Sequence, residues 1–190
     1  MSLSNAKLYG GIGAILQLVS IFAGTYSWLL SIVGLVLVFL AVKIISEEAG
    51  DSDIFNYYLK AFISMVAGLL LFFVIIVATA GTAIIKGLKG GMMSPEHFFA
   101  ILGSILIGFV ILWIAYIIGT YFQKKSFELI AQYTDVGLFK TTGLLYFIGA
   151  ILLIIAIGAL ILLIGAILEI VAFFSLPDEI KKLERSAVSP

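Results

Sequence analysis

The sequence predicts an all-α integral membrane protein, a helical bundle with six transmembrane helices and helical hairpins at both ends of the chain. Its composition is the first observation that predicts this class. Hydrophobic residues make up 63% of the chain and charged residues 12%, whereas soluble domains contain about 45–50% and about 25%. Because a soluble domain of this length exposes part of its surface to water, so much apolar surface indicates a bilayer.

Long apolar segments are the second observation. Short polar stretches separate four of them, at residues 8–45, 57–85, 97–122 and 144–174. A bilayer core about 30 Å thick needs about 20 helical residues, each with a rise of about 1.5 Å. The first segment would form one helix of roughly 55 Å and the last one of roughly 45 Å, and both are too long for a single span. We therefore expect two helices in each of these two segments.

The first segment has a break at Gly24-Thr25-Tyr26-Ser27. Glycine, threonine and serine favour a turn, and Tyr26 and Trp28 suit the headgroup interface. Helices are therefore expected near residues 7–23 and 27–46.

The last segment has no polar turn, and Gly158 lies near its middle. The pentapeptide Ile-Gly-Ala-Ile-Leu occurs at residues 12–16, 148–152 and 164–168, which suggests a hairpin unit at both ends of the chain. Chance recurrence in a sequence rich in Ile, Leu, Gly and Ala is the alternative. The repeat predicts two short helices, near residues 141–157 and 159–174. Terminal spans of about 16 residues are slightly short for a typical bilayer, so they are expected to be untilted or re-entrant.

The polar stretches carry signals for helix ends. Asp51-Ser52-Asp53 can cap the helix that follows, since acids are favoured at its positive end. Gly87, Gly90 and Gly91 are expected to end that helix. Ser94-Pro95-Glu96 has the order of an N-cap, a first-position proline and a first-turn acid, so the next helix is expected to begin there. Residues 123–134 contain no helix breaker, and this helix is expected to continue past the membrane or to turn along its surface.

The basic residues predict the orientation, because Lys and Arg favour cytoplasmic loops. With six spans and both termini inside, Lys86 and Lys89 lie outside, and the other nine of the 11 basic residues lie inside. These nine are Lys7, Lys43, Lys60, Lys124, Lys125, Lys140, Lys181, Lys182 and Arg185. We therefore expect a cell-membrane protein with cytoplasmic N and C termini, a transmembrane domain over residues 1–176 and a short cytoplasmic tail over residues 177–190.

Glu169 is the only acid inside an apolar segment. A bare carboxylate in hydrocarbon is costly, so an ionisable residue in a membrane helix is a candidate functional site, here for an ion or a proton. Lys43, Lys60 and Lys140 are expected near the same membrane face and are candidate partners. A structural ion pair, or a carboxyl that reaches the interface, is the favoured interpretation because Glu169 lies close to a helix end. Lys43 itself is expected to extend to the interface.

Gln17 lies in the middle of the first helix, where its amide needs a partner. We expect this side chain to face another helix rather than a substrate. Small residues at helical spacing let membrane helices approach closely, either within the bundle or at a subunit interface. The candidate packing residues are Gly13, Ser64, Gly68, Ser104, Gly108, Gly149 and Gly165.

Several classes of chemistry have no support in the sequence. The chain has no Cys, which excludes disulfides, thiolate metal sites and Cys nucleophiles. A net charge of zero gives no indication of a nucleic-acid partner. Asp51 and Asp53 lack the further ligands of a calcium loop, and a single His97 cannot make an ordinary zinc site. We predict no catalytic residue, no metal site and no cofactor.

Three stretches give the chain a likeness to a known family. They are residues 10–16 (Gly-Gly-Ile-Gly-Ala-Ile-Leu), residues 139–149 (Phe-Lys-Thr-Thr-Gly-Leu-Leu-Tyr-Phe-Ile-Gly) and residues 171–175 (Val-Ala-Phe-Phe-Ser). With them the sequence resembles a small, uncharacterised family of archaeal and bacterial membrane proteins, a domain of unknown function. This resemblance covers most of the chain. It implies a multi-span helical fold and no activity, so it assigns no catalytic residues.

We expect a non-catalytic structural or accessory subunit, not an enzyme, that contacts membrane lipid and packs against partner subunits or a second copy of itself. Sparse charge within the membrane and the absence of catalytic motifs favour this function. The alternative is a small channel or transporter with Glu169 and Gln17 lining the path. Broken helices in corresponding places are typical of transporters, but two polar residues are few for a path.

Overall fold

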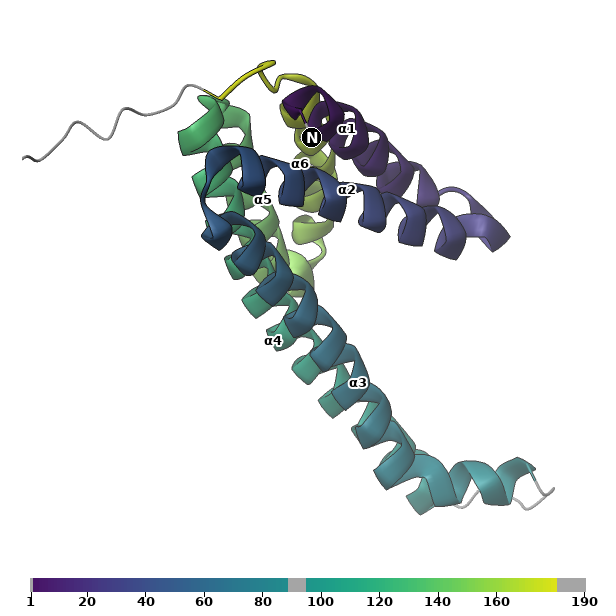
Figure 1. The fold of residues 1–190 in the computed structure, drawn as a ribbon. Coiled ribbons are helices and arrows are strands. Elements are labelled where there is room, and N and C mark those ends of the chain that lie inside the picture. Colours follow the sequence, from purple (N-terminus) through teal and green to yellow (C-terminus); the bar gives the residue numbers. More distant parts are fainter. Residues whose placement is uncertain (1, 89–94, 181–190) are drawn as a thin grey trace, which may run out of the picture. The chain divides into compact units, whose positions relative to one another are not determined.

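The predicted all-α class is confirmed. The computed structural model describes residues 2–88 and 95–180, and within these ranges it contains helices and no strand. The helices are α1 (Leu3–Ser20), α2 (Ser27–Ala49), α3 (Ser52–Leu88), α4 (Pro95–Thr134), α5 (Gly137–Leu152) and α6 (Ile157–Phe174), with the short 3₁₀ turns η1 (Gly24–Tyr26) and η2 (Leu153–Ile155) (Figure 1). Predictions for Lys89, Gly90, Gly91, Ser94, Lys181, Lys182 and Arg185 lie outside the described residues, as do the side chains of Lys86 and His97.

Five helical segments of the described chain are long and apolar enough to cross a membrane. They are Gly24–Ala49, Ser52–Ala78, Phe98–Thr134, Gly137–Ile155 and Ile157–Phe174. The helix α1 has 18 residues, but Asn5, Lys7 and Gln17 make it less apolar than the other five. That α1 is a sixth span stays a prediction.

The chain forms two compact units, Met1–Lys60 with Thr120–Pro190, and Ala61–Gly119. We call them the six-helix unit and the two-helix unit. All six helices contribute to the first, and the second contains only parts of α3 and α4. The boundary expected at residue 177 stays a prediction, although Leu176 is buried in the core of the six-helix unit.

In the six-helix unit, α1 and α2 form one of the two expected hairpins. Their backbones touch at Gly13 and Gly34, where a Cβ built on either glycine would lie 2.7 Å from the carbonyl oxygen of the other. A hydrogen bond of 2.8 Å from Ser31 Oγ to Ser20 Oγ adds a polar link between the helices. The sequence analysis had not identified this serine pair, although polar links of this kind are common between membrane helices.

The helices α5 and α6 form the second hairpin and use the same kind of contact. A Cβ built on Gly158 would lie 2.2 Å from the carbonyl oxygen of Gly149, and one on Gly149 would lie 3.2 Å from that of Gly158. Gly13 and Gly149 occupy the same place in two copies of the repeated pentapeptide. The two hairpins are therefore closed in the same way, by glycine against glycine.

The hairpins are joined through α1 and α6. Phe173 and Phe174 of α6 lie against Gly10 and Gly11 of α1, where any Cβ would meet the rings at 2.1–2.8 Å. Beyond the end of α6, Lys7 Nζ donates a hydrogen bond of 3.3 Å to the carbonyl oxygen of Leu176. Gly10 and Gly11 thus form a surface against which the two aromatic rings pack.

A chain of aromatic contacts connects the remaining helices of this unit. Ring centroids are 4.9 Å apart for Phe39 and Tyr58, and 6.3 Å apart for Tyr58 and Phe127. They are 5.5 Å apart for Phe127 and Phe139, and 5.1 Å apart for Phe139 and Phe173. Since each ring comes from a different helix, these contacts link α2, α3, α4, α5 and α6 in turn.

The loop between α2 and α3 confirms the predicted cap. Gly50 ends α2 with φ +66°, and the N–H groups of Gly50 and Asp51 donate to the carbonyls of Glu47 and Ser46 in a Schellman arrangement. Asp51 Oδ1 then accepts a hydrogen bond of 2.9 Å from the N–H of Asp53, and Asp51 Oδ2 accepts one of 3.0 Å from Tyr133 of α4. A single aspartate therefore caps α3 and ties the loop to α4.

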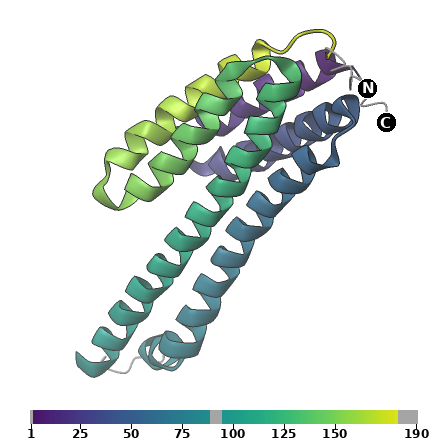
Figure 2. The same ribbon diagram turned by 90° about the vertical axis from the view of Figure 1, so that its left-hand side faces the viewer.

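The two-helix unit is an antiparallel pair, with the two helices side by side (Figure 2). A Cβ on Gly68 would lie 2.3 Å from Cβ of Ala115, one on Gly108 would lie 2.7 Å from the ring of Phe72, and Gly119 lies against Met65. In each of these helices, only 11% of the apolar 18-residue stretch that could cross the membrane is buried. Pro95 opens α4, and α4 continues without a break to Thr134, so the expected helix start and the expected continuation through residues 123–134 are both confirmed.

The two hairpin turns differ from each other. Gly24 lies in the first turn with φ +54°, as the sequence indicated. The second turn is not at Gly158, as expected, but at Ala156, which has φ +62°. Gly158 already belongs to α6, because its missing side chain is needed for the contact with Gly149.

Replacing Ala156 by glycine is expected to raise the free energy of unfolding by about 1 kcal/mol, since an L side chain is disfavoured in the left-handed region. The matched change in the other turn, Gly24→Ala, is expected to lower it by a similar amount. No atom lies within 4 Å of a Cβ at Gly24, so only the backbone preference acts there. Denaturant titration in detergent micelles measures both. A change of the same sign from both substitutions would contradict this account of the turns.

Candidate functional site

Glu169 is the buried carboxyl of the six-helix unit, with 5% of its surface exposed. Its partner is Tyr146 of α5, whose hydroxyl donates a hydrogen bond to Glu169 Oε2. The packing of α5 on α6 explains this pairing. Gly165 lies one turn before Glu169 and has no side chain, so the Tyr146 ring lies 3.0 Å from where its Cβ would be.

Two of the three lysines expected near Glu169 are engaged elsewhere, and the third, Lys140, is exposed at the start of α5. Lys43 Nζ lies 3.9 Å from Glu47, and its side chain is 57% exposed, which fits the expectation that it extends to the interface. Lys60 lies 5.2 Å from the ring of Tyr57. Lys43 pairs with Glu47, and Lys124 and Lys125 pair with Glu128, so none of these three ion pairs includes Glu169. The expected pairing of Glu169 with lysine is thus replaced by a tyrosine hydroxyl.

Thr142 is a second buried polar group of α5. Its hydroxyl is the only buried side-chain oxygen or nitrogen of the described residues without a hydrogen-bond partner. Phe139 meets Phe173 and Tyr146 meets Gly165, so the antiparallel register brings Thr142 to the level of Glu169. Neither Thr142 nor Tyr146 was expected from the sequence, because only the register between α5 and α6 brings Tyr146 to the carboxyl and Thr142 to its level.

Glu169 and Tyr146 provide a carboxyl and a hydroxyl that share a hydrogen bond, and Thr142 provides a further buried hydroxyl on α5. Within the described chain, no three His, Asp or Glu side chains lie close enough together to hold a metal ion. The arrangement is that of a structural polar link between two helices.

Replacing Tyr146 by phenylalanine is expected to lower the free energy of unfolding by about 1–3 kcal/mol, because it leaves a buried carboxyl without its donor. Tyr26→Phe is the matched control, since Tyr26 is 71% exposed, and no change is expected from it. Combining Tyr146→Phe with Glu169→Leu should restore part of the loss, because no buried polar group is then left unpaired. Thermal unfolding of the unchanged protein and the three variants in detergent measures these differences. Equal losses from Tyr146→Phe and Tyr26→Phe would contradict the assignment.

Gln17 lies on the face of α1 that meets α2, as expected. A Cβ on Gly34 would lie 2.9 Å from Gln17 Cγ, so the aliphatic part of the side chain fills the space over that glycine. Gln17 and Glu169 are on different helices of different hairpins.

The small residues singled out in the sequence mostly pack within the chain. Gly13 contacts α2, Gly149 and Gly165 join α5 and α6, and Gly68 and Gly108 join α3 and α4. Ser104 is buried, and its Oγ donates a hydrogen bond of 2.6 Å to the carbonyl of Ala100, while Ser64 is partly buried. Of the two places left open by the sequence, the bundle interior and a subunit interface, these glycines occupy the first.

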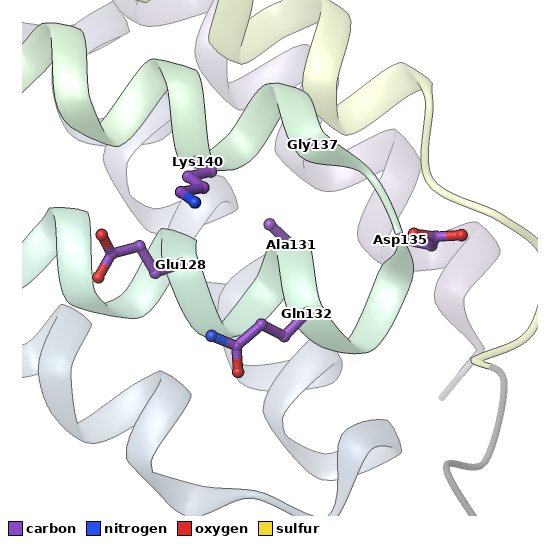
Figure 3. Close-up of a pocket in the computed structure, with 6 residues that line it drawn as sticks. All are labelled: Glu128, Ala131, Gln132, Asp135, Gly137 and Lys140. Atoms are coloured by element: carbon purple, nitrogen blue, oxygen red, sulfur yellow. The ribbon is translucent and has the colours of Figure 1, made fainter.

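A polar hollow of about 450 Å³ lies where α4 ends and α5 begins. Its lining residues are Glu128, Ala131, Gln132, Asp135, Gly137 and Lys140. Figure 3 shows Glu128 and Lys140 on neighbouring turns of the two helices, with the side chain of Asp135 pointing away from them. Glu128 is already paired with Lys124 at 2.7 Å. The hollow is therefore a surface feature lined by side chains of both charges.

Comparison with known proteins gives a family without a known activity. The chain matches a family described as "Protein of unknown function (DUF996)" over residues 30–167. An uncharacterized protein, MJ1644 of the archaeon Methanocaldococcus jannaschii, is 40% identical to it over 181 residues, which are 95% of this chain and 97% of that protein. No solved structure matches the chain. The resemblance stated from the sequence is thereby confirmed.

Proposed function

The chain belongs to the DUF996 family of proteins of unknown function, and we propose that it is a non-catalytic structural or accessory subunit of a membrane assembly. The observation that carries this proposal is the closed environment of Glu169. That carboxyl is 5% exposed and hydrogen-bonded to Tyr146. Residues that line a path for ions or solutes have to reach water, and the polar hollow beside α4 is lined by other residues.

The contact between the hairpins supports the same function. A channel between them would need a gap, but Phe173 and Phe174 fill the glycine surface of α1. In the six-helix unit the small residues and aromatic rings pack against each other, which is typical of a protein core rather than of a pore.

The two-helix unit provides the surface for partners. Its outward side chains include Leu70, Val74 and Val77, which are 60%, 61% and 70% exposed, and Phe99, which is 67% exposed. Within the bilayer such a surface is covered by lipid, by another subunit or by a second copy of the chain. We place the partner contact here because this unit covers so little of its own apolar surface.

The proposed location is the cell membrane, with both termini in the cytoplasm. The described lysines outside the two-helix unit support this orientation. Lys7 and Lys140 lie in the first two turns of α1 and α5, and Lys43 lies in the last two turns of α2. Lys60, Lys124 and Lys125 lie within about three turns of the ends of α3 and α4 that adjoin the loops α2–α3 and α4–α5. Basic residues at one end of a bundle indicate its cytoplasmic side.

The test begins with gentle purification of the full chain and measurement of the particle mass in detergent or amphipol. We expect a defined particle heavier than the 20.5 kDa monomer. Replacing Leu70, Val74 and Val77 together by alanine should reduce this mass. The matched control replaces Ile32, Val33 and Val36, which are 53%, 41% and 51% exposed on α2, and it should leave the mass unchanged.

Reconstitution into liposomes tests the transport alternative. A monomer that carries an ion or proton flux, lost on Glu169→Gln, would overturn the proposal.

Orientation is tested by labelling single cysteines with an impermeant reagent. Gln132→Cys, on an exposed residue of α4, should be labelled only from the cytoplasmic side, and Ser27→Cys only from outside.

A further inference from the structure

The turn between α5 and α6 is the most apolar turn of the six-helix unit. Residues 147–168, which include this turn, contain no polar and no charged side chain. Its side chains are nevertheless uncovered, with Ile154 70%, Ile155 57%, Ile157 56% and Leu160 65% exposed. In Figure 2 this turn forms the free end of the hairpin. A cluster of exposed isoleucines is costly in water but suits hydrocarbon.

We propose that this turn lies inside the hydrocarbon of the bilayer, in contact with lipid acyl chains, and does not reach water on the far side of the membrane. The hairpin of α5 and α6 then enters and leaves through the same face, as a re-entrant hairpin.

The lengths of the two helices fit this placement. From Lys140 to Leu152, α5 contributes 13 residues, and η2 adds the three residues Leu153–Ile155. This gives about 20 Å at about 1.5 Å per residue and about 6 Å at about 2.0 Å per residue. The other arm, α6, has 18 residues, or about 27 Å. The hydrocarbon core is about 30 Å thick. The exposed Lys140, in the first turn of α5, holds that end of the hairpin at a headgroup interface, so the turn falls short of the opposite one.

The backbone of the turn is suited to a medium without water. Irregular backbone is tolerated in hydrocarbon only where its polar groups find partners. Here the N–H of Leu153 donates to Ala150, that of Ala156 to Leu153 at 3.1 Å, and that of Ala159 to Ala156 at 3.0 Å. The carbonyl oxygen of Gly149 lies close to the backbone of α6, since it would be 2.2 Å from a Cβ built on Gly158.

The other hairpin provides the contrast. The turn between α1 and α2 contains Gly24, Thr25 and Ser27, and its exposed aromatic residues are Tyr26 at 71% and Trp28 at 63%. Tyrosine and tryptophan are the residues of the headgroup interface. The left-handed position of that turn is a glycine, whereas alanine occupies it in the α5–α6 turn. One turn therefore has interfacial chemistry, and the other has none.

Spin labelling in liposomes tests the proposal. The chain has no Cys, so Ile154→Cys places a single nitroxide in the turn, and Tyr26→Cys places one in the other turn as the matched control. We expect the label at residue 154 to collide with oxygen, which dissolves in lipid, and to be shielded from a water-soluble nickel complex. The label at residue 26 should be several-fold more accessible to the nickel complex.

Three results would overturn the proposal. Equal access of the nickel complex to both labels would place the α5–α6 turn in water. Shielding from both reagents, with magnetic broadening between labels, would show that a second copy covers the turn. Shielding from both reagents without broadening would show that protein other than the same turn of a second copy covers this turn. Leu160→Cys, in the first turn of α6, repeats the test if Ile154→Cys does not fold.

Discussion

Replacing Gly158 by alanine is expected to disrupt the hairpin of α5 and α6 and to lower the free energy of unfolding by about 3 kcal/mol or more. The added Cβ would lie 2.2 Å from the carbonyl oxygen of Gly149, 2.3 Å from the nitrogen of Leu153 and 2.5 Å from the carbonyl carbon of Leu152. All three are backbone atoms, which cannot move aside without separating the helices. This loss of stability is opposite to the usual effect of the substitution, because alanine is ordinarily favoured over glycine within a helix by about 1 kcal/mol.

Gly103→Ala is the matched control for this substitution. Gly103 is also helical, but no atom lies within 4 Å of its Cβ position, so this change should be neutral or raise stability by up to about 1 kcal/mol. Reversible unfolding by sodium dodecyl sulfate in mixed micelles, followed by circular dichroism, measures both variants. A similar stability for the two would mean that the close approach of Gly149 and Gly158 is not required for the fold.

The second large effect is expected from Phe139→Ala, with a loss of about 3 kcal/mol. Phe139 is fully buried, and its ring centroid lies 5.5 Å from that of Phe127 and 5.1 Å from that of Phe173. Its removal leaves a cavity in the middle of the aromatic chain that links α4, α5 and α6. Within a membrane protein this loss is mainly one of packing contacts, because lipid is as apolar as the core.

Phe22→Ala is the control for Phe139→Ala. Phe22 is 79% exposed near the turn between α1 and α2, so its removal creates no cavity, and stability should change little. The two variants are compared by the same unfolding titration. Equal losses would show that the aromatic chain contributes no more to the fold than an exposed ring does.

Local signals in the sequence determined most of the helix boundaries. The turn at Gly24, the cap at Asp51 and the start of α4 at Pro95 were all predicted, because each depends on the conformational preference of a few adjacent residues. The apolar composition likewise determined the helical membrane class, since it depends only on which residues are present.

The tertiary structure alone decided which residues meet. Glu169 is bonded to Tyr146 rather than to a lysine, and this pairing depends on the register between α5 and α6. The second turn lies at Ala156, because Gly158 is needed against Gly149. A local sequence signal determines where a chain turns, whereas the partner of a side chain depends on how two separate helices slide and rotate against each other, and many such arrangements suit the same apolar sequence.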